Sequence, residues 1–260
     1  MVGYRHLTIN LASALAAAAA LSGQAASAAT LDLTLQDQAR QRTIPVELSF
    51  PAAPCTTAPC PVALLSAGYG IGHKEYHFLV EELNRSGWLV VSVEHQLPAD
   101  ATLDRNGDIV AQMKPMRRRG VANLRFVQDT LAKSHPGYDW RHVTLIGHSL
   151  GGDISADRAS EGDATITRLV TLDSRRAALP RSAAVKVLSI RASDTQADPG
   201  VLPDAQEQKQ YGACIVKLAG AKHNEMYDGG GAELKAAINR ITQAFLGKGT
   251  CEVLPGFTGG

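Results

Sequence analysis

Hydrophobic and polar positions follow two different patterns along the chain. Residues 30–35 and 43–50 place apolar side chains at every second position on either side of a polar segment, as in an edge hairpin with one solvated face. From residue 61 onward, short runs are continuously apolar, which is typical of strands that are covered on both faces. These runs are residues 62–65, 88–91, 143–146, 169–172, 185–190 and 214–218.

Segments with helical spacing lie between the apolar runs. They cover residues 76–86, 117–133, 150–160 and 232–245. Parallel strands need long crossover connections, which are usually helical. The alternation therefore predicts an α/β fold, with a mostly parallel central sheet and helices on both faces. Ligands bind such sheets at the carboxyl ends of the strands, so chemistry is expected in the loops that follow them.

The amino-terminal residues have a pattern of their own. Basic residues precede an alanine-rich apolar stretch, and Ala26-Ser27-Ala28 supplies the small residues that signal peptidase requires. We interpret residues 1–28 as a signal peptide and residues 29–260 as one domain, which predicts a secreted or periplasmic protein. Because the apolar stretch is interrupted well short of the ~20 residues that span a bilayer, we expect no stable membrane insertion.

Four cysteines lie in the predicted mature chain, where an oxidising compartment favours disulfides over free thiols. Three connectivities are possible. We favour Cys55 with Cys60, inside a short loop, and Cys214 with Cys251, which would tie the last helix to the final strand.

The charge balance of the chain bears on its partners. The 26 basic and 25 acidic side chains nearly cancel. No large net field therefore favours binding to nucleic acid or to an anionic membrane surface, and neutral or small partners are expected.

A candidate nucleophile follows the apolar run at residues 143–146. Residues 147–151 read Gly-His-Ser-Leu-Gly, a G-x-S-x-G sequence that leads into a predicted helix. A serine lifted on a tight strand-to-helix turn occupies strained backbone, and its glycine neighbours let the strand and the helix approach each other. The sequence thus predicts that Ser149 is a catalytic nucleophile.

A serine nucleophile needs a base, and the base needs a partner that fixes its tautomer. His223 follows the run at 214–218 and is the only histidine after His148, so we expect it to be the base. Asp194 follows the run at 185–190 and is the predicted acid, which gives the chain order Ser, Asp, His. Asp198 in the same loop and Asp173 at the end of the preceding strand are alternatives. Asp173 is the stronger one, because a carboxylate one strand earlier can reach the same imidazole.

Two backbone N–H groups usually stabilise the oxyanion of such a reaction. The N–H of Leu150, directly after the nucleophile, is one expected donor. The other is expected from the loop after residues 62–65, where the glycines that flank Tyr69 permit close approach of the backbone and make its N–H the candidate. This chemistry requires no metal and no organic cofactor.

With these residues in place, the chain resembles small members of the α/β-hydrolase superfamily over nearly all of the predicted mature sequence. Residues 66–70, 147–151 and 193–195 carry the resemblance, and dienelactone hydrolases, platelet-activating-factor acetylhydrolases and cutinase-like polyester hydrolases are similar. The resemblance implies a triad of Ser149, Asp194 and His223, with Tyr69 as the second oxyanion donor.

Two connections qualify this resemblance. Only residues 174–184 separate Asp173 from the next strand, which is too short for the helical cap of many lipases and predicts little or no cap. The one long insertion, residues 96–116, contains a predicted hairpin at residues 103–110, with Asn106-Gly107 at its turn.

The residues and the resemblance together predict a secreted serine hydrolase that cleaves carboxylic esters, from small molecules or polymers, through an acyl-enzyme. One alternative is an amidase or peptidase that uses the same triad, which leaving-group preference would distinguish. Another is a non-catalytic binding protein on the hydrolase scaffold. The complete set of Ser149, Asp194 and His223 argues against that second alternative.

Overall fold

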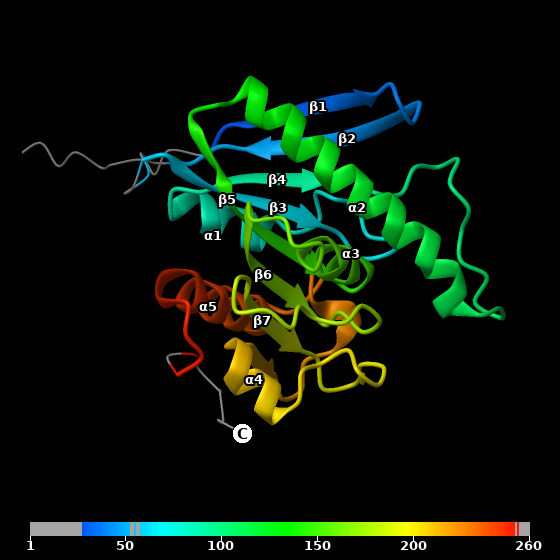
Figure 1. Cartoon of the computed structure of the whole chain (residues 1–260), viewed down its shortest axis with the longest axis vertical. Coiled ribbons are helices and arrows are strands. Elements are labelled where there is room, and N and C mark those ends of the chain that lie inside the picture. The colour runs from blue at the N-terminus through cyan, green and yellow to red at the C-terminus, as the bar shows by residue number, and fades with distance from the viewer. Residues whose placement is uncertain (1–27, 53–54, 56–57, 253, 255–260) are drawn as a thin grey trace, which may run out of the picture.

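An eight-stranded sheet forms the centre of the computed structural model, which describes residues 28–52, 55, 58–252 and 254 (Figure 1). Its strands are β1 (Thr30–Asp37), β2 (Arg42–Ser49), β3 (Cys60–Ser66), β4 (Leu89–Val93), β5 (Tyr138–His148), β6 (Ile166–Leu172), β7 (Lys186–Arg191) and β8 (Cys214–Lys217). They lie in the order β1-β2-β4-β3-β5-β6-β7-β8. β1 is antiparallel to β2, and β2 is antiparallel to β4. The six strands β3 to β8 are parallel to one another.

Helices cover both faces of this sheet. They are α1 (His77–Arg85), α2 (Ile109–Ser134), α3 (Leu150–Ala159), α4 (Ala205–Tyr211) and α5 (Ala232–Lys248), with a short 3-10 turn η1 (His223–Glu225). α2 and α3 pack together on one face, and α1 and α5 pack together on the other (Figure 1). The predicted α/β class with a mostly parallel sheet is confirmed.

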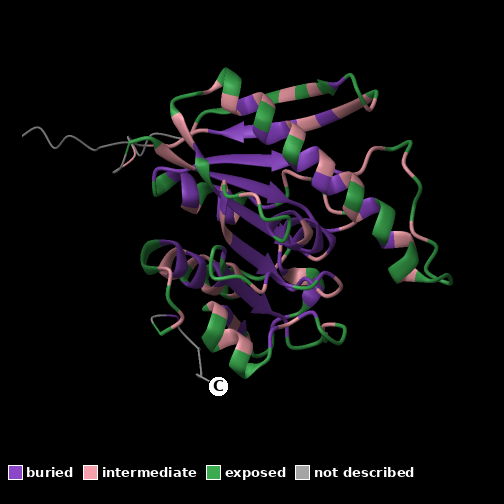
Figure 2. Ribbon diagram, viewed as in Figure 1, coloured by how far each residue is buried: buried purple, intermediate pink, exposed green. Residues whose placement is uncertain are grey.

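Burial along the strands follows the two sequence patterns. β4 is buried at every residue, and β3 is buried over its last five, as the continuous apolar runs predict. β1 instead exposes most of its side chains, because only one of its faces meets the rest of the protein (Figure 2). Each face of the sheet therefore carries its own hydrophobic core.

The insertion between β4 and β5 differs from the prediction. Residues 103–110 do not form a hairpin, and α2 begins at Ile109 instead of residue 117. Asp108 caps the helix, because its side chain accepts a hydrogen bond from the N–H of Ala111 at 3.0 Å. The helix also accommodates Pro115 in its second turn. A turn does form at Asn106-Gly107, where the N–H of Gly107 donates to the carbonyl of Asp104 at 3.1 Å, but the capped helix that starts at Ile109 takes the place of the second strand.

α4 was not predicted from apolar spacing, because none of its residues is buried. A reciprocal capping box starts it. Asp204 accepts from the N–H of Glu207 at 2.8 Å, and the Glu207 carboxylate accepts from the N–H of Asp204 at 3.0 Å.

Both favoured disulfides are present. Cys55 and Cys60 have Cα atoms 5.4 Å apart, and Cys214 and Cys251 have Cα atoms 5.2 Å apart. The second bridge ties β8 to the segment that follows α5, as the sequence suggested.

The predicted signal peptide, residues 1–28, lies outside the described residues except for Ala28. Across the part of the chain that the structure describes, no helix is long and apolar enough to cross a membrane.

α3 approaches the sheet very closely at Gly151. A Cβ atom at this position would lie 2.1 Å from the backbone oxygen of Ser66, at the end of β3. Backbone atoms cannot move aside as a flexible side chain can. This contact therefore requires glycine and fixes where the helix begins relative to β3.

We expect Gly151→Ala to lower the free energy of unfolding by about 3 kcal/mol or more, because the added methyl group overlaps the backbone of β3. Gly247→Ala is a matched control, since Gly247 is also helical and nothing lies near its would-be Cβ. That variant should gain roughly 0.5–1 kcal/mol. Urea unfolding of both variants measures the difference, and equal midpoints would contradict the close approach.

Candidate active site

Ser149 lies on the tight turn between β5 and α3. Its backbone has φ 52° and ψ −119°, a conformation that non-glycine residues rarely adopt. Its N–H donates to the carbonyl of Leu172 in β6 at 2.9 Å, which holds the turn against the neighbouring strand. The side chain is partly exposed at the carboxyl edge of the sheet. This is the placement that the G-x-S-x-G sequence predicts for Ser149.

A continuous hydrogen-bond chain starts at the hydroxyl of Ser149. The Oγ atom lies 2.9 Å from Nε2 of His223, which begins the η1 turn after β8. The other ring nitrogen, Nδ1, lies 2.6 Å from Oδ2 of Asp173. Asp173 is fully buried and His223 nearly so, so the chain runs from a partly exposed hydroxyl to a buried carboxylate.

The structure places Asp194, the acid predicted first, in a different position. Its side chain is exposed, and its Oδ1 accepts the backbone N–H of His223 at 2.8 Å rather than the ring N–H. Asp194 therefore holds the backbone of the η1 turn. Asp173, the alternative acid, is the carboxylate that faces the imidazole.

Strand register explains this difference. His148, Leu172 and Ile190 are paired across β5, β6 and β7. The residues that follow them, Ser149, Asp173 and Arg191, consequently emerge side by side at the same edge. Asp194 comes three residues after Arg191, beyond this level.

Four groups contact the buried carboxylate of Asp173. Oδ2 accepts from His223 and from the hydroxyl of Thr195, and Oδ1 accepts from the N–H of Ala192 at 3.0 Å. Arg191 Nη2 lies 2.8 Å from Oδ1. Burial alone would raise the pKa of Asp173, but these hydrogen bonds and the charge of Arg191 outweigh it and lower the pKa to about 2. Asp173 is therefore ionised at neutral pH.

A second hydrogen-bond chain connects the loop after β3 to the elbow, the tight turn between β5 and α3 that carries His148 and Ser149. Tyr76 accepts the N–H of Gly68 at 3.0 Å, and its hydroxyl lies 2.8 Å from Nδ1 of His148. Nε2 of His148 lies 3.0 Å from the carbonyl of His223. Burial lowers the pKa of His148 to about 3, so its ring is neutral. Tyr76 then donates to Nδ1, and the Nε2–H donates to His223.

The two expected oxyanion donors lie at the start of α3 and in the loop after β3. The N–H of Leu150 is in the first turn of α3, where backbone N–H groups have no intrahelical partner. The N–H of Tyr69 likewise donates to no acceptor among the described residues. Both groups are thus available to a ligand.

A cavity of about 180 Å³ adjoins these two residues. Besides Tyr69 and Leu150, its wall includes apolar side chains of Met116 and Ile154, and Arg119 contributes a polar part. No helix stands between β6 and β7 in the described structure, so no cap covers this edge of the sheet.

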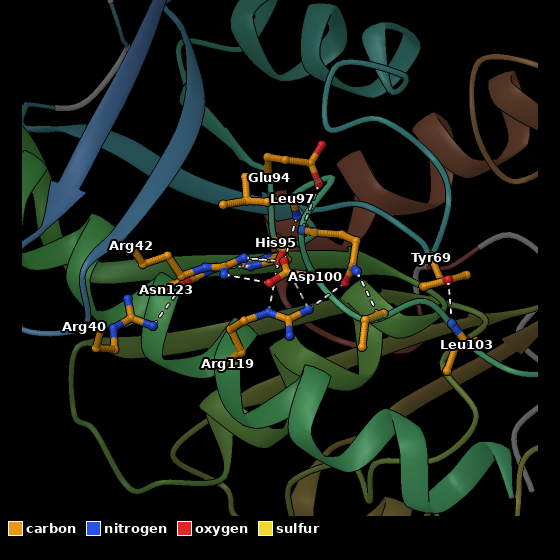
Figure 3. Close-up of polar contacts among 12 residues, drawn as sticks. Arg40, Arg42, Tyr69, Glu94, His95, Leu97, Asp100, Leu103, Arg119 and Asn123 are labelled. Atoms are coloured by element: carbon orange, nitrogen blue, oxygen red, sulfur yellow. Dashed lines mark hydrogen bonds and ion pairs between the residues drawn. The ribbon is translucent and has the colours of Figure 1, made fainter.

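The loop after β4 lines part of this cavity, and Figure 3 shows polar contacts that hold the loop in place. Arg42 binds both carboxylate oxygens of Asp100, at 2.9 and 2.6 Å, and Arg119 Nη2 lies 3.5 Å from the same carboxylate. The hydroxyl of Tyr69 accepts the N–H of Leu103 from this loop at 2.8 Å. The ring of a candidate oxyanion residue is therefore anchored to the insertion.

No protein-family model matches the chain, and no curated protein matches its sequence. Solved structures do resemble it. A ferulic acid esterase from Streptomyces cinnamoneus has a TM-score of 0.62 and 18% identity over 90% of this chain and 92% of its own. A putative dienelactone hydrolase from Klebsiella pneumoniae has a TM-score of 0.61 and 17% identity over 85% and 99%. An α/β serine hydrolase without a lid from Xanthomonas campestris has a TM-score of 0.52 and 16% identity over 82% and 92%. Together with the sheet order and the strand-to-helix elbow, these likenesses show that the chain has the α/β-hydrolase fold.

Proposed function

We propose that the protein is a serine hydrolase that cleaves carboxylic esters, with Ser149 as nucleophile, His223 as base and Asp173 as acid. The observation that carries this proposal is the hydrogen-bond chain from the Ser149 hydroxyl through both ring nitrogens of His223 to Asp173. The strained backbone at Ser149 supports the proposal, as do the N–H groups of Tyr69 and Leu150, two residues that line the same cavity. The preference for esters is supported by the likeness to a ferulic acid esterase and to a putative dienelactone hydrolase.

In the first step, Nε2 of His223 takes the proton of Ser149 while Oγ attacks the ester carbonyl carbon. The ionised Asp173 accepts from Nδ1–H, which fixes the tautomer and stabilises the imidazolium. The N–H groups of Tyr69 and Leu150 stabilise the oxyanion. His223 then protonates the leaving alcohol, which leaves an acyl group on Ser149.

In the second step, His223 removes a proton from water, and the water oxygen attacks the acyl carbon. The same two N–H groups stabilise the second oxyanion. The acid leaves as His223 returns the proton to Oγ of Ser149.

The cavity beside Tyr69 and Leu150 is proposed to hold the acyl group. Its volume of about 180 Å³ is smaller than the ~300–1,000 Å³ of pockets for drug-sized ligands. Met116 and Ile154 form its apolar wall, and both are buried. A short acyl group therefore fits this site better than a long chain.

We also propose that the protein is exported, as its first 28 residues suggest. Two disulfides support this, because such bonds persist in oxidising compartments.

The nucleophile can be tested without knowledge of the substrate. A fluorophosphonate is expected to form one stoichiometric adduct on Ser149, because His223 activates the hydroxyl. Mass spectrometry of the intact protein and its peptides locates the adduct. His223→Ala should abolish labelling, and a well-folded wild-type protein that remains unlabelled would exclude the proposed mechanism.

The choice of acid can be tested with two isosteric variants. Asp173→Asn should lower kcat/KM for a reactive ester by about 10³–10⁴-fold, because the amide favours the wrong His223 tautomer. Asp194→Asn should change it by less than about tenfold, since its amide oxygen can still accept the backbone N–H of His223. The opposite ranking would return the acid role to Asp194.

Met116→Ala is expected to shift the acyl preference toward longer chains. Each additional methylene that the enlarged cavity buries contributes ~0.8 kcal/mol, which corresponds to about a fourfold change in kcat/KM. The ratio of kcat/KM for p-nitrophenyl octanoate and butyrate measures this shift. Val110→Ala, an exposed position on the same helix, should leave the ratio unchanged. An unaltered ratio in Met116→Ala would place the acyl group elsewhere.

A further inference from the structure

We propose that Arg191 is a positioning residue, which orients Asp173 toward His223 and sets the pH range in which His223 acts as a base. This inference rests on the proposed function. It assigns a role to a buried cation that the acyl-transfer steps themselves do not use.

Arg191 ends β7 and is 4% exposed. Its Nη2 lies 2.8 Å from Oδ1 of Asp173, and its Nη1 donates to the carbonyl of Ser174. Both interactions are with consecutive residues after β6. The guanidinium therefore joins the end of β7 to the turn that carries the acid.

The two carboxylate oxygens of Asp173 have separate partners. Arg191 and the N–H of Ala192 face Oδ1, whereas Thr195 and His223 bind Oδ2. Because Oδ1 is occupied on the β7 side, rotation of the carboxylate away from the imidazole would break an ion pair and a hydrogen bond. Arg191 thus restricts Asp173 to the orientation that the His223 ring requires.

A buried ion pair is weak evidence for stability, because desolvation offsets much of the attraction between the charges. Its position beside a proposed triad acid indicates a role in the site. The positive charge partly neutralises Asp173. The imidazolium of His223 consequently gains less stabilisation from Asp173 than it would from an unpaired carboxylate.

Other charged or titratable groups face this pair from each neighbouring element. His148 on the elbow is neutral, and its ring centroid lies 5.1 Å from that of His223. The Asp194 carboxylate accepts the backbone N–H of His223 and, among the described residues, has no hydrogen bond to the His223 ring. Further charged groups nearby are Asp153 on α3, Arg175 after β6, Lys217 on β8, Asp198 after β7, and the exposed Lys222–Glu225 pair at η1. All of them are retained in the Arg191 variants.

The test is the rate of fluorophosphonate labelling of Ser149 between pH 4 and 9, in full-length wild-type protein and in Arg191→Met. Labelling needs neutral His223. Without the cation of Arg191, the imidazolium is better stabilised and keeps its proton to higher pH. The midpoint of the acid limb is therefore expected to rise by about one pH unit. The plateau rate is expected to fall about tenfold, since Asp173 is less well oriented.

Two charge controls accompany this variant. Lys222→Met removes an exposed and solvent-screened cation next to His223, and its midpoint should stay within about 0.3 unit of the wild type. Arg191→Lys retains the charge, so its midpoint should remain near that of the wild type even where its plateau rate falls. Arg191→Gln, whose amide can donate to Ser174, replaces Arg191→Met if thermal melting shows that the latter is unfolded.

If the wild type is labelled and the folded neutral variant, Arg191→Met or Arg191→Gln, has the same midpoint, this inference is overturned. The proposed function is not affected by that outcome. An upward shift in Arg191→Lys as large as in the neutral variant would also overturn the role of the charge. Absence of labelling in the wild type would instead contradict the proposed function.

Discussion

Parallel pairing in register across β5, β6 and β7 brings three chemically different residues to one level of the sheet. The row through His148, Leu172 and Ile190 pairs the three strands at one level near their carboxyl ends. The next residue along each strand is Ser149, Asp173 or Arg191, and Arg191 is the last residue of β7, where it still pairs with Lys217 of β8. Backbone hydrogen bonds lock this arrangement, because Ser149 N–H donates to Leu172 and the N–H of Asp173 donates to Ile190 at 2.8 Å. The hydroxyl, the carboxylate and the guanidinium are placed by main-chain geometry before any side chain interacts.

Asp173 and Arg191 are both charged and buried, and their opposite charges lie next to each other. The ionised Asp173 is paired with Arg191, and three further donors satisfy its oxygens. His148 contributes no charge, since burial keeps its ring neutral. An unpaired buried charge would cost several kcal/mol. The β7 loop thus supplies the groups that make a buried acid tolerable at β6.

The sequence predicted much of the fold because most of its signals are local. Continuous apolar runs located the parallel strands, and the glycines around Ser149 located the elbow. Neither the position of α4 nor the start of α2 followed from apolar spacing, since caps at Asp204 and Asp108 decide them. The position of an acid relative to His223 depends on register between strands that are distant in sequence. For that reason the chain order Ser, Asp, His fits both Asp194 and Asp173, and the sequence predicts Asp194 first.

One signal in the sequence could have favoured Asp173. Arg191 is a charged residue at the end of a run that is otherwise apolar from Val187 onward, apart from Ser189. A cation at the edge of a buried parallel strand needs a nearby anion. Asp194, on the loop after the same strand, can turn toward solvent. Asp173 directly follows the adjacent strand at the level of Arg191, so its carboxylate stays beside the guanidinium.

The loop that carries Tyr69, the proposed oxyanion donor, is held from two sides by the surrounding structure. Tyr76 binds the N–H of Gly68 and links it through His148 to the backbone of His223. A Cβ atom at Gly68 would lie 2.9 Å from His148 Nδ1, so the loop rests directly on that ring. The ring of Tyr69, the next residue, is tied to the insertion through Leu103. Preorganised donors stabilise an oxyanion only if they cannot turn away from it. Because one of these two links leads to His223, the proposed base, this loop and His223 are both positioned relative to His148 at the strand-to-helix turn.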